Sequence, residues 1–323
     1  MFDFTNEKTV LCYQWMNMSK SQYYIVTHLE KKMKLAGCYT ALITPFRNGL
    51  VDYEALTRLL QSQIDAGVAG VVPVGTTGES PTLSMEEHDK VIAFVINFCK
   101  GKCQVIAGTG GNSTAEAIHL TKHAAEMGAD ATLQVTPYYN KPTPEGMYRH
   151  FMTVAEETGL PVVLYNVPGR TGKEIPIEVI ARLSKSPLMV AVKEAAGSVE
   201  RVNAIKAVCD MTVLSGDDSL TLPMMSVGAS GVISVASNIL PKEVVAMVSN
   251  ALKGDFVAAL QIHKRLYPLY RDLFIESNPI PIKAAMADMG LIAEEYRLPL
   301  CEMQVGNREK LRATMRAVGI ELR

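Results

Sequence analysis

The sequence lacks the features that define several large protein classes. No run of about 18 consecutive apolar residues occurs in the 323-residue chain, so we expect no transmembrane helix. The formal net charge is only −1, which gives no electrostatic reason to expect nucleic acid or an anionic membrane as a partner. The glycine-rich fingerprints of dinucleotide-binding and P-loop proteins are also missing.

Cysteine is scarce as well, with six residues in the chain. Most stand alone among apolar residues, and the one close pair, Cys99 and Cys103, has no second pair to complete a four-ligand zinc site. We therefore expect reduced thiols, a cytoplasmic location and no bound metal.

What the chain does have is apolar sequence for a large core, because 48% of its residues are hydrophobic and 20% are charged. The globular pattern begins near Leu35, just after a second possible start at Met33. Residues 1–33 contain acidic side chains and no apolar stretch of signal-peptide length. We interpret them as a dispensable extension, disordered or left by a misplaced start codon.

Short apolar, β-branched runs recur about 30 residues apart, which is the spacing of one strand–helix unit. Because they are apolar throughout, they are typical of parallel strands buried on both faces. The eight runs are Tyr39–Ile43, Gly70–Val74, Gln104–Ala107, Ala131–Val135, Pro161–Leu164, Leu188–Val192, Met211–Leu214 and Gly231–Val235. Helical patterns lie between them, with Asp52 as a cap for one helix and Ser84 with Glu87 as a capping box for the next.

Eight such units predict an α/β fold, a closed (β/α)8 TIM barrel, rather than an open sheet. We expect the barrel over residues 34–254. Residues 255–323 have a helical pattern without a strand, and we expect them to form a C-terminal helical appendage.

In a parallel barrel the chemistry lies on the face where the strands end. The residues expected there include hydroxyls, phenols, one lysine and one arginine, but no histidine. The carboxylates at this rim are Glu79, Glu194, Asp217 and Asp218, and they form no obvious metal cluster. This set favours carbonyl chemistry through an amine over metal-assisted hydrolysis.

Lys193 directly follows an apolar strand, so the strand should carry its amine toward the barrel interior. Burial disfavours the charged form of an amine. A neutral amine can attack a ketone to give an iminium ion, which acidifies the adjacent methyl group and yields an enamine nucleophile. The simpler alternative is a lysine that reaches solvent or pairs with Glu194.

Hydroxyl groups and an arginine on neighbouring strand ends supply the other parts of such a site. Thr76, Thr77, Tyr139 and Tyr165 can move protons or hold a carboxylate. Arg170 can bind a second substrate's carboxylate through its planar guanidinium group. Each also has a plainer explanation, as a turn residue, a packing residue at the rim or a solvated arginine.

Six motifs stand in order on the expected strand ends: Gly75–Glu79, Tyr138–Pro142, Tyr165–Gly172, Val192–Ala195, Ser215–Asp218 and Gly231–Asn238. From about residue 33 to the C-terminus, they resemble those of the dihydrodipicolinate synthase family. This is a family of pyruvate-dependent class I aldolases that is related to N-acetylneuraminate lyase. The resemblance implies condensation of pyruvate with L-aspartate 4-semialdehyde, in lysine and diaminopimelate biosynthesis, without a cofactor.

The resemblance also implies catalytic roles. Lys193 would form the Schiff base with pyruvate. Thr76, Tyr139 and Tyr165 would relay protons, with Tyr139 inserted from a neighbouring subunit. Members of this family are usually homotetramers built as a dimer of tight dimers.

Substrate-binding roles follow in the same way. Thr77 and the backbone near Gly216 and Ile233 would hold pyruvate, and Arg170 would bind the carboxylate of the semialdehyde. Relatives that cleave N-acetylneuraminate or keto-deoxy sugar acids tend to carry Ser-Thr in place of Thr76-Thr77 and no arginine at the position of Arg170. The pattern here therefore favours the synthase. It also disfavours a catalytically silent, ligand-sensing barrel, because the catalytic set is intact.

The family's allosteric site for L-lysine, at the tight-dimer interface, corresponds to Ser80, Leu83, His88, Asn112, Glu116 and Tyr138. Met85 and Pro81 depart from the lysine-sensitive pattern, in which histidine and alanine are common. Since Glu116 could pair with the effector's ammonium group, we predict inhibition by L-lysine, weakened relative to a fully matching site. The alternative is a hydrated interface without an effector.

Overall fold

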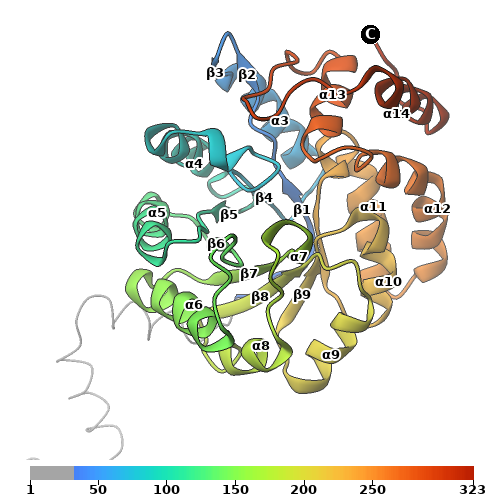
Figure 1. The fold of residues 1–323 in the computed structure, drawn as a ribbon. Helices are drawn as coiled ribbons and strands as arrows, with labels where there is room; N and C mark the ends of the chain where they lie inside the picture. Colours follow the sequence, from blue (N-terminus) through green and yellow to red (C-terminus); the bar gives the residue numbers. More distant parts are fainter. Residues whose placement is uncertain (1–32) are drawn as a thin grey trace, which may run out of the picture. The chain divides into compact units, whose positions relative to one another are not determined.

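The computed structural model describes residues 33–323, and eight parallel strands within them close into a barrel in the order β1-β10-β9-β8-β7-β6-β5-β4. The strands are β1 (Gly37–Ala41), β4 (Gly70–Val72), β5 (Gln104–Gly108), β6 (Ala131–Val135), β7 (Val162–Asn166), β8 (Met189–Glu194), β9 (Thr212–Ser215) and β10 (Gly231–Ser234). Figure 1 shows them as an inner ring surrounded by helices. The predicted TIM barrel is confirmed. The extension expected at residues 1–33 lies outside the described residues, Met33 excepted.

A helix follows each barrel strand in sequence, and these helices shield the outside of the barrel. They are α3 (Tyr53–Asp65), α4 (Met85–Cys99), α5 (Thr114–Met127), α6 (Pro144–Thr158), α8 (Ile177–Leu183), α9 (Glu200–Val208), α10 (Thr221–Ser226) and α11 (Pro241–Leu252). Two of them begin at the predicted caps. Asp52 accepts a hydrogen bond from the Ala55 N–H, and Ser84 and Glu87 form the full capping box.

Short helical elements lie at the rim of the barrel where the strands end. They are α7 (Pro168–Thr171) and the 3₁₀ turns η1 (Ser80–Thr82), η2 (Asp218–Leu220) and η3 (Ala236–Asn238). A two-stranded hairpin of β2 (Phe46–Arg47) and β3 (Leu50–Val51) was not predicted. Asn48 and Gly49 both have positive φ, as the tightest hairpin turns require. The Asn-Gly pair was the available signal, but two-residue strands are too short to show a pattern.

Two strand ends differ from the prediction in a way that matters for the site. Tyr165 and Lys193 were expected just after their strands, but they lie inside β7 and β8. The strands continue because their backbones remain paired, with Tyr165 opposite Lys193 and Asn166 opposite Glu194. In contrast, β4 ends before Pro73, which has no N–H to donate to a strand ladder.

The C-terminal region consists of α12 (Phe256–Asp272), α13 (Ile280–Asp288) and α14 (Val305–Ala317). Helix α12 packs against α11, and α14 packs against both α12 and α13. Residues 35–323 form one compact unit, and the expected boundary at 254/255 falls in a tight turn between two packed helices. Most of α13 is buried, including Lys283.

Five of the six cysteines fall within the described residues and are free thiols, as expected, whereas Cys12 lies outside them. Among residues 33–323, no helix is both long enough and apolar enough to cross a membrane. The same residues contain no cluster of three or more His, Cys, Asp or Glu side chains that could hold a metal ion. The cytoplasmic location stays a prediction.

Candidate active site

Lys193 and Tyr165 form the centre of the candidate site. They lie directly opposite each other on β7 and β8, and both side chains are buried, with Lys193 only 6% exposed. The Lys193 Nζ lies 4.3 Å from the centroid of the Tyr165 ring. The parallel pairing of two strands therefore places an amine against a phenol inside the barrel.

Glu194 is not the partner of Lys193, so the simpler explanation of this lysine is wrong. Successive side chains of a strand point to opposite faces, and Glu194 accordingly faces away from Lys193. Its carboxylate accepts hydrogen bonds from Asn166 Nδ2 at 2.8 Å and Arg201 Nε at 3.1 Å. Burial nevertheless raises the pKa of Glu194, and the Arg201 charge opposes that shift.

Two further carboxyls stand close to the lysine. Burial raises the pKa of Asp217 to about 6, although the Lys193 cation favours its charged form. Burial also raises the pKa of Asp218, whose carboxylate accepts hydrogen bonds from Ser234 Oγ and from the backbone N–H groups of Val235 and Ala236. Asp218 thus fastens the end of β10 to the segment that follows β9.

Gly216 lets the backbone approach the lysine closely. A methyl group built on Gly216 would lie 3.1 Å from Lys193 Cε and 2.6 Å from Ala195 Cβ, so any larger residue would displace one of them. Its N–H donates to the Glu194 carbonyl at 2.7 Å. Ile233 is buried on β10, one strand further along the barrel, where its position opposes Tyr39 of β1.

The segment that follows β4 carries the two predicted threonines. Thr76 is half-buried, and its carbonyl accepts the Glu79 N–H at 3.1 Å. Thr77 is buried, and its Oγ1 accepts a hydrogen bond from Asn278 Nδ2 at 2.9 Å. Asn278 belongs to the turn before α13, so the C-terminal region contacts the site directly.

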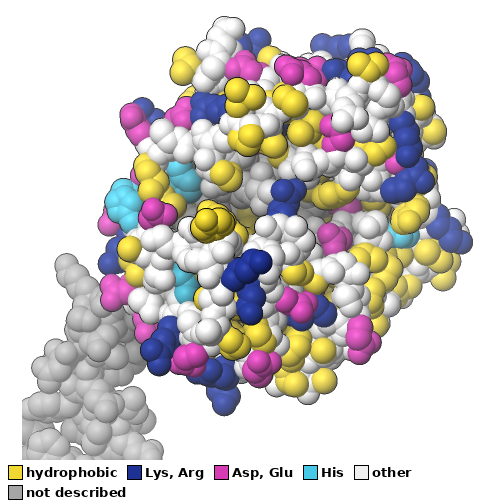
Figure 2. Space-filling model, in the orientation of Figure 1, with side chains coloured by type: hydrophobic (Ala, Val, Ile, Leu, Met, Phe, Trp, Pro, Cys, Tyr) yellow, Lys and Arg dark blue, Asp and Glu magenta, His cyan; other side chains and the backbone are white. Residues whose placement is uncertain are grey.

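Arg170 lies on α7, where its Nη2 donates to the Asn278 carbonyl at 2.9 Å. Its side chain borders a cavity of about 410 Å³ that Thr76 and Tyr165 also line. Lys193 does not line this cavity. Its amine packs against the ring of Tyr165, and Tyr165 is one of the lining residues. Figure 2 shows the barrel rim as a surface hollowed near its middle, with basic and acidic side chains around the hollow.

Part of the predicted effector set lines the same cavity. Ser80, Glu116 and Tyr138 border it, together with Pro81 and Met85, the two positions that depart from the lysine-sensitive pattern. The remaining three do not. Asn112 Nδ2 donates to the Tyr138 carbonyl at 3.2 Å, Leu83 is half-buried, and His88 is buried with its Nε2 3.0 Å from the Gly108 carbonyl.

Among the four catalytic candidates, Tyr139 alone has an exposed side chain. Its side chain is 90% exposed and does not line the cavity. Its φ is +70°, a left-handed conformation that is uncommon for residues other than glycine. Asn140 Nδ2 donates to the Asn112 carbonyl at 2.8 Å, which ties this turn to the loop after β5. The phenol is therefore held away from its own barrel.

Sequence reasoning missed Asn278 and Lys283. Both lie in the C-terminal region that was expected to be an appendage, yet Asn278 contacts Thr77 and the Lys283 ammonium pairs with the Glu79 carboxylate. A signal was available, since an isolated lysine stands in the apolar run Ile282–Met286 directly after an Asn-Pro turn.

A second cavity, of about 430 Å³ near Cys99 and Cys103, contains none of the predicted site residues.

Comparison with known proteins identifies the family of the chain. The model of the dihydrodipicolinate synthetase family matches residues 34–318. The 4-hydroxy-tetrahydrodipicolinate synthase of Aquifex aeolicus is 50% identical over 290 residues, which cover 89% of this chain and 99% of that protein. The chain belongs to the dihydrodipicolinate synthetase family.

Two solved structures of this family carry ligands of interest. Dihydrodipicolinate synthase from Acinetobacter baumannii, complexed with pyruvate, has a TM-score of 0.87 at 45% identity and covers 89% of this chain and 100% of its own. The enzyme from Cyanidioschyzon merolae, with lysine bound, has a TM-score of 0.86 at 41% identity and covers 88% and 99%. Its membership of this family makes the chain an enzyme of the lyase class.

Proposed function

We propose that this enzyme condenses pyruvate with L-aspartate 4-semialdehyde, and that Lys193 carries the reaction as a Schiff base. The observation that supports this most is the buried amine of Lys193 against the phenol ring of Tyr165. An amine held in a largely dry site can attack the pyruvate ketone, and water leaves as the imine forms. The pyruvate-bound relative from Acinetobacter baumannii supports the choice of first substrate.

The remaining steps need only proton transfers and a second carbonyl. Loss of a methyl proton from the imine gives an enamine, whose carbon attacks the aldehyde carbon of the semialdehyde. The semialdehyde's amino group then closes a ring on the imine carbon and releases Lys193. Tyr165 and Thr76 are proposed as proton carriers, because both border the cavity. Thr77, Gly216 and Ile233 are proposed to bind pyruvate.

We also propose that the active enzyme is a homotetramer of tight dimers in which Tyr139 completes the site of a neighbouring subunit. The outward position of Tyr139 and its left-handed backbone support this, since strained conformations persist where function requires them. The polar contacts of Asn112 and Asn140 hold the turn in that position.

Replacing Lys193 with alanine should abolish imine formation, because no other amine occupies its place. Incubation with pyruvate and borohydride should reduce a pyruvyl adduct onto Lys193 in the wild type, as found by peptide mass mapping. Activity of Lys193→Ala should fall by about 10⁴-fold or more. The exposed Lys185→Ala is the matched control and should keep full labelling. An adduct on another lysine would contradict the proposal.

Replacing Arg170 with alanine should raise the KM for the semialdehyde by about 10- to 100-fold, since a charge-assisted contact to its carboxylate is lost. The KM for pyruvate should change little. Arg149→Ala, an exposed change on α6, serves as control. Turnover of N-acetylneuraminate by the wild type, in the absence of turnover of aspartate semialdehyde, would instead favour the lyase alternative.

Mixing two inactive variants tests whether Tyr139 acts in the neighbouring subunit. Tyr139→Phe should lower the rate by about 10²-fold or more through loss of a proton carrier. When it is mixed with Lys193→Ala under conditions that allow subunit exchange, activity should reappear, because some sites then contain both intact residues. Failure to recover activity in mixed oligomers, verified by native mass spectrometry, would show that Tyr139 acts only within its own chain.

Inhibition by L-lysine is proposed from the position of Glu116, which borders the cavity with Ser80 and Tyr138. The lysine-bound relative supports this choice of effector. We expect partial inhibition that weakens about tenfold in Glu116→Gln, as the loss of one ion pair implies. Glu126→Gln, exposed on the same helix, should behave like the wild type. A flat activity curve up to millimolar lysine would refute the proposal.

A further inference from the structure

The ion pair between Lys283 and Glu79 is the most deeply buried one in the part of the chain that the structure describes, and the reaction proposed above does not use it. Both side chains are fully shielded from solvent. Burial lowers the pKa of Lys283, and the Glu79 carboxylate opposes that shift. Because a buried charge needs a partner, either residue would be costly to keep without the other. The position of the pair suggests why both are present.

Glu79 ends the short segment 75–79 that carries Thr76 and Thr77. Its φ is +55°, so its backbone adopts the left-handed conformation that a residue with a side chain rarely takes. Both carboxylate oxygens are used, one by the Lys283 ammonium and the other by the Arg297 backbone N–H at 3.3 Å. The conformation of the segment is therefore fixed from outside, by residues more than 200 positions away in sequence.

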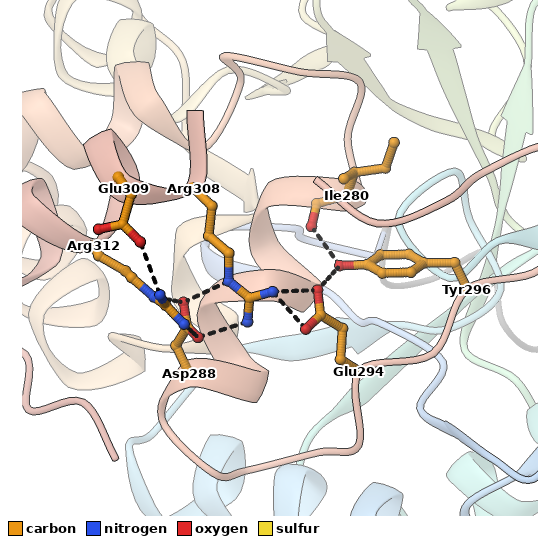
Figure 3. A network of polar contacts seen from close by, with 7 residues as sticks. All are labelled: Ile280, Asp288, Glu294, Tyr296, Arg308, Glu309 and Arg312. Carbon is orange, nitrogen blue, oxygen red and sulfur yellow. Dashed lines mark hydrogen bonds and ion pairs between the residues drawn. The ribbon is translucent and has the colours of Figure 1, made fainter. Parts of the chain in front are cut away.

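Lys283 is fixed just as firmly. Its Nζ lies 4.3 Å from the centroid of the Phe46 ring and 5.3 Å from that of the Tyr296 ring, which is cation–π distance. Figure 3 shows that Tyr296 is itself held, because its hydroxyl contacts the Ile280 carbonyl and Glu294. Arg308 then connects Glu294 to Asp288 near the end of α13.

The turn before the same helix holds Thr77 and Arg170. Asn278 donates to Thr77 Oγ1, and its carbonyl accepts from Arg170, both at 2.9 Å. One stretch of the C-terminal region, residues 278–283, thus contacts the threonine segment at two points. Both contacts reach the segment that carries Thr76 and Thr77, the two threonines proposed to act on pyruvate.

The geometry points to Lys283 and Glu79 as positioning residues that set Thr76 and Thr77 for pyruvate, so that the C-terminal helices tune the affinity of the active site. This inference rests on the proposed function. Neither residue touches the substrate; the pair acts through the backbone of segment 75–79. Its loss should therefore affect the first substrate selectively.

Two variants test the inference. Lys283→Met keeps most of the length of the side chain without its charge, and Glu79→Gln keeps the shape and can still accept from the Arg297 N–H. In folded protein, both should raise the KM for pyruvate by about 10- to 100-fold and slow borohydride trapping at low pyruvate concentration. The KM for the semialdehyde should stay within about twofold of the wild-type value.

Arg312→Met is the matched control for a basic residue of the same region. Arg312 pairs with Asp288 in the network of Figure 3, with no contact to segment 75–79 among its ion pairs. It should lower the melting temperature without changing either KM. An equal rise in the pyruvate KM in this control would overturn the inference, because any loss of stability would then suffice.

The remaining outcomes are also decisive. A pyruvate KM within twofold of wild type in both folded variants would refute the positioning role. If neither variant folded, the pair would act on the whole fold, and the inference would fail in that way too. A wild-type protein that forms no pyruvyl adduct would instead refute the proposed function itself, which separates the two failures.

Discussion

The parallel pairing of β7 with β8 is the constraint around which the candidate site is arranged. It places Tyr165 opposite Lys193 and sends the next residue, Glu194, to the other face of the sheet. Glu194 then pairs with Arg201 and Asn166, so the carboxylate nearest in sequence does not neutralise the amine. A shift of one residue in this pairing would reverse every side chain and exchange the roles of the lysine and the glutamate.

The two aspartates near Lys193, Asp217 and Asp218, differ in the hydrogen bonds that their carboxyl groups accept. Asp218 is buried but accepts three hydrogen bonds, one from Ser234 at the end of β10 and two from the backbone just after it, so it serves to join strand ends. Asp217 has only the Gly197 backbone N–H among such contacts in the described residues, and burial raises its pKa to about 6. Such groups can change protonation near neutral pH, which suits a rim where protons must move.

A single cavity is lined by some members of the catalytic and substrate-binding set and by some members of the effector set. Thr76, Tyr165 and Arg170 line it with Ser80 and Glu116, so the two sets are separated by side chains and not by a domain boundary. In the homotetramer proposed above, a neighbour's Tyr139 would enter from outside, which agrees with the exposure of its side chain. Any coupling between effector and substrate would then need only a short path through segment 75–80.

Much of the fold could be predicted because its signals are local. Apolar runs gave the positions of eight strands, and side-chain caps at Asp52 and Ser84 gave the beginnings of two helices. Strand ends were less predictable, since Tyr165 and Lys193 continue their strands only through pairing with each other. The hairpin at Asn48 and Gly49 was missed because its strands are only two residues long.

The sequence by itself determined the barrel, the lysine and the ordered rim motifs that assign the chain to its family. These depend on residue type and spacing, which are written along the chain. Only the tertiary structure decided that Glu194 turns away from Lys193 and that Tyr139 faces outward. It alone joined Lys283 to Glu79 and Asn278 to Thr77, because these residues are more than 200 positions apart and no local pattern identifies the partner of either one.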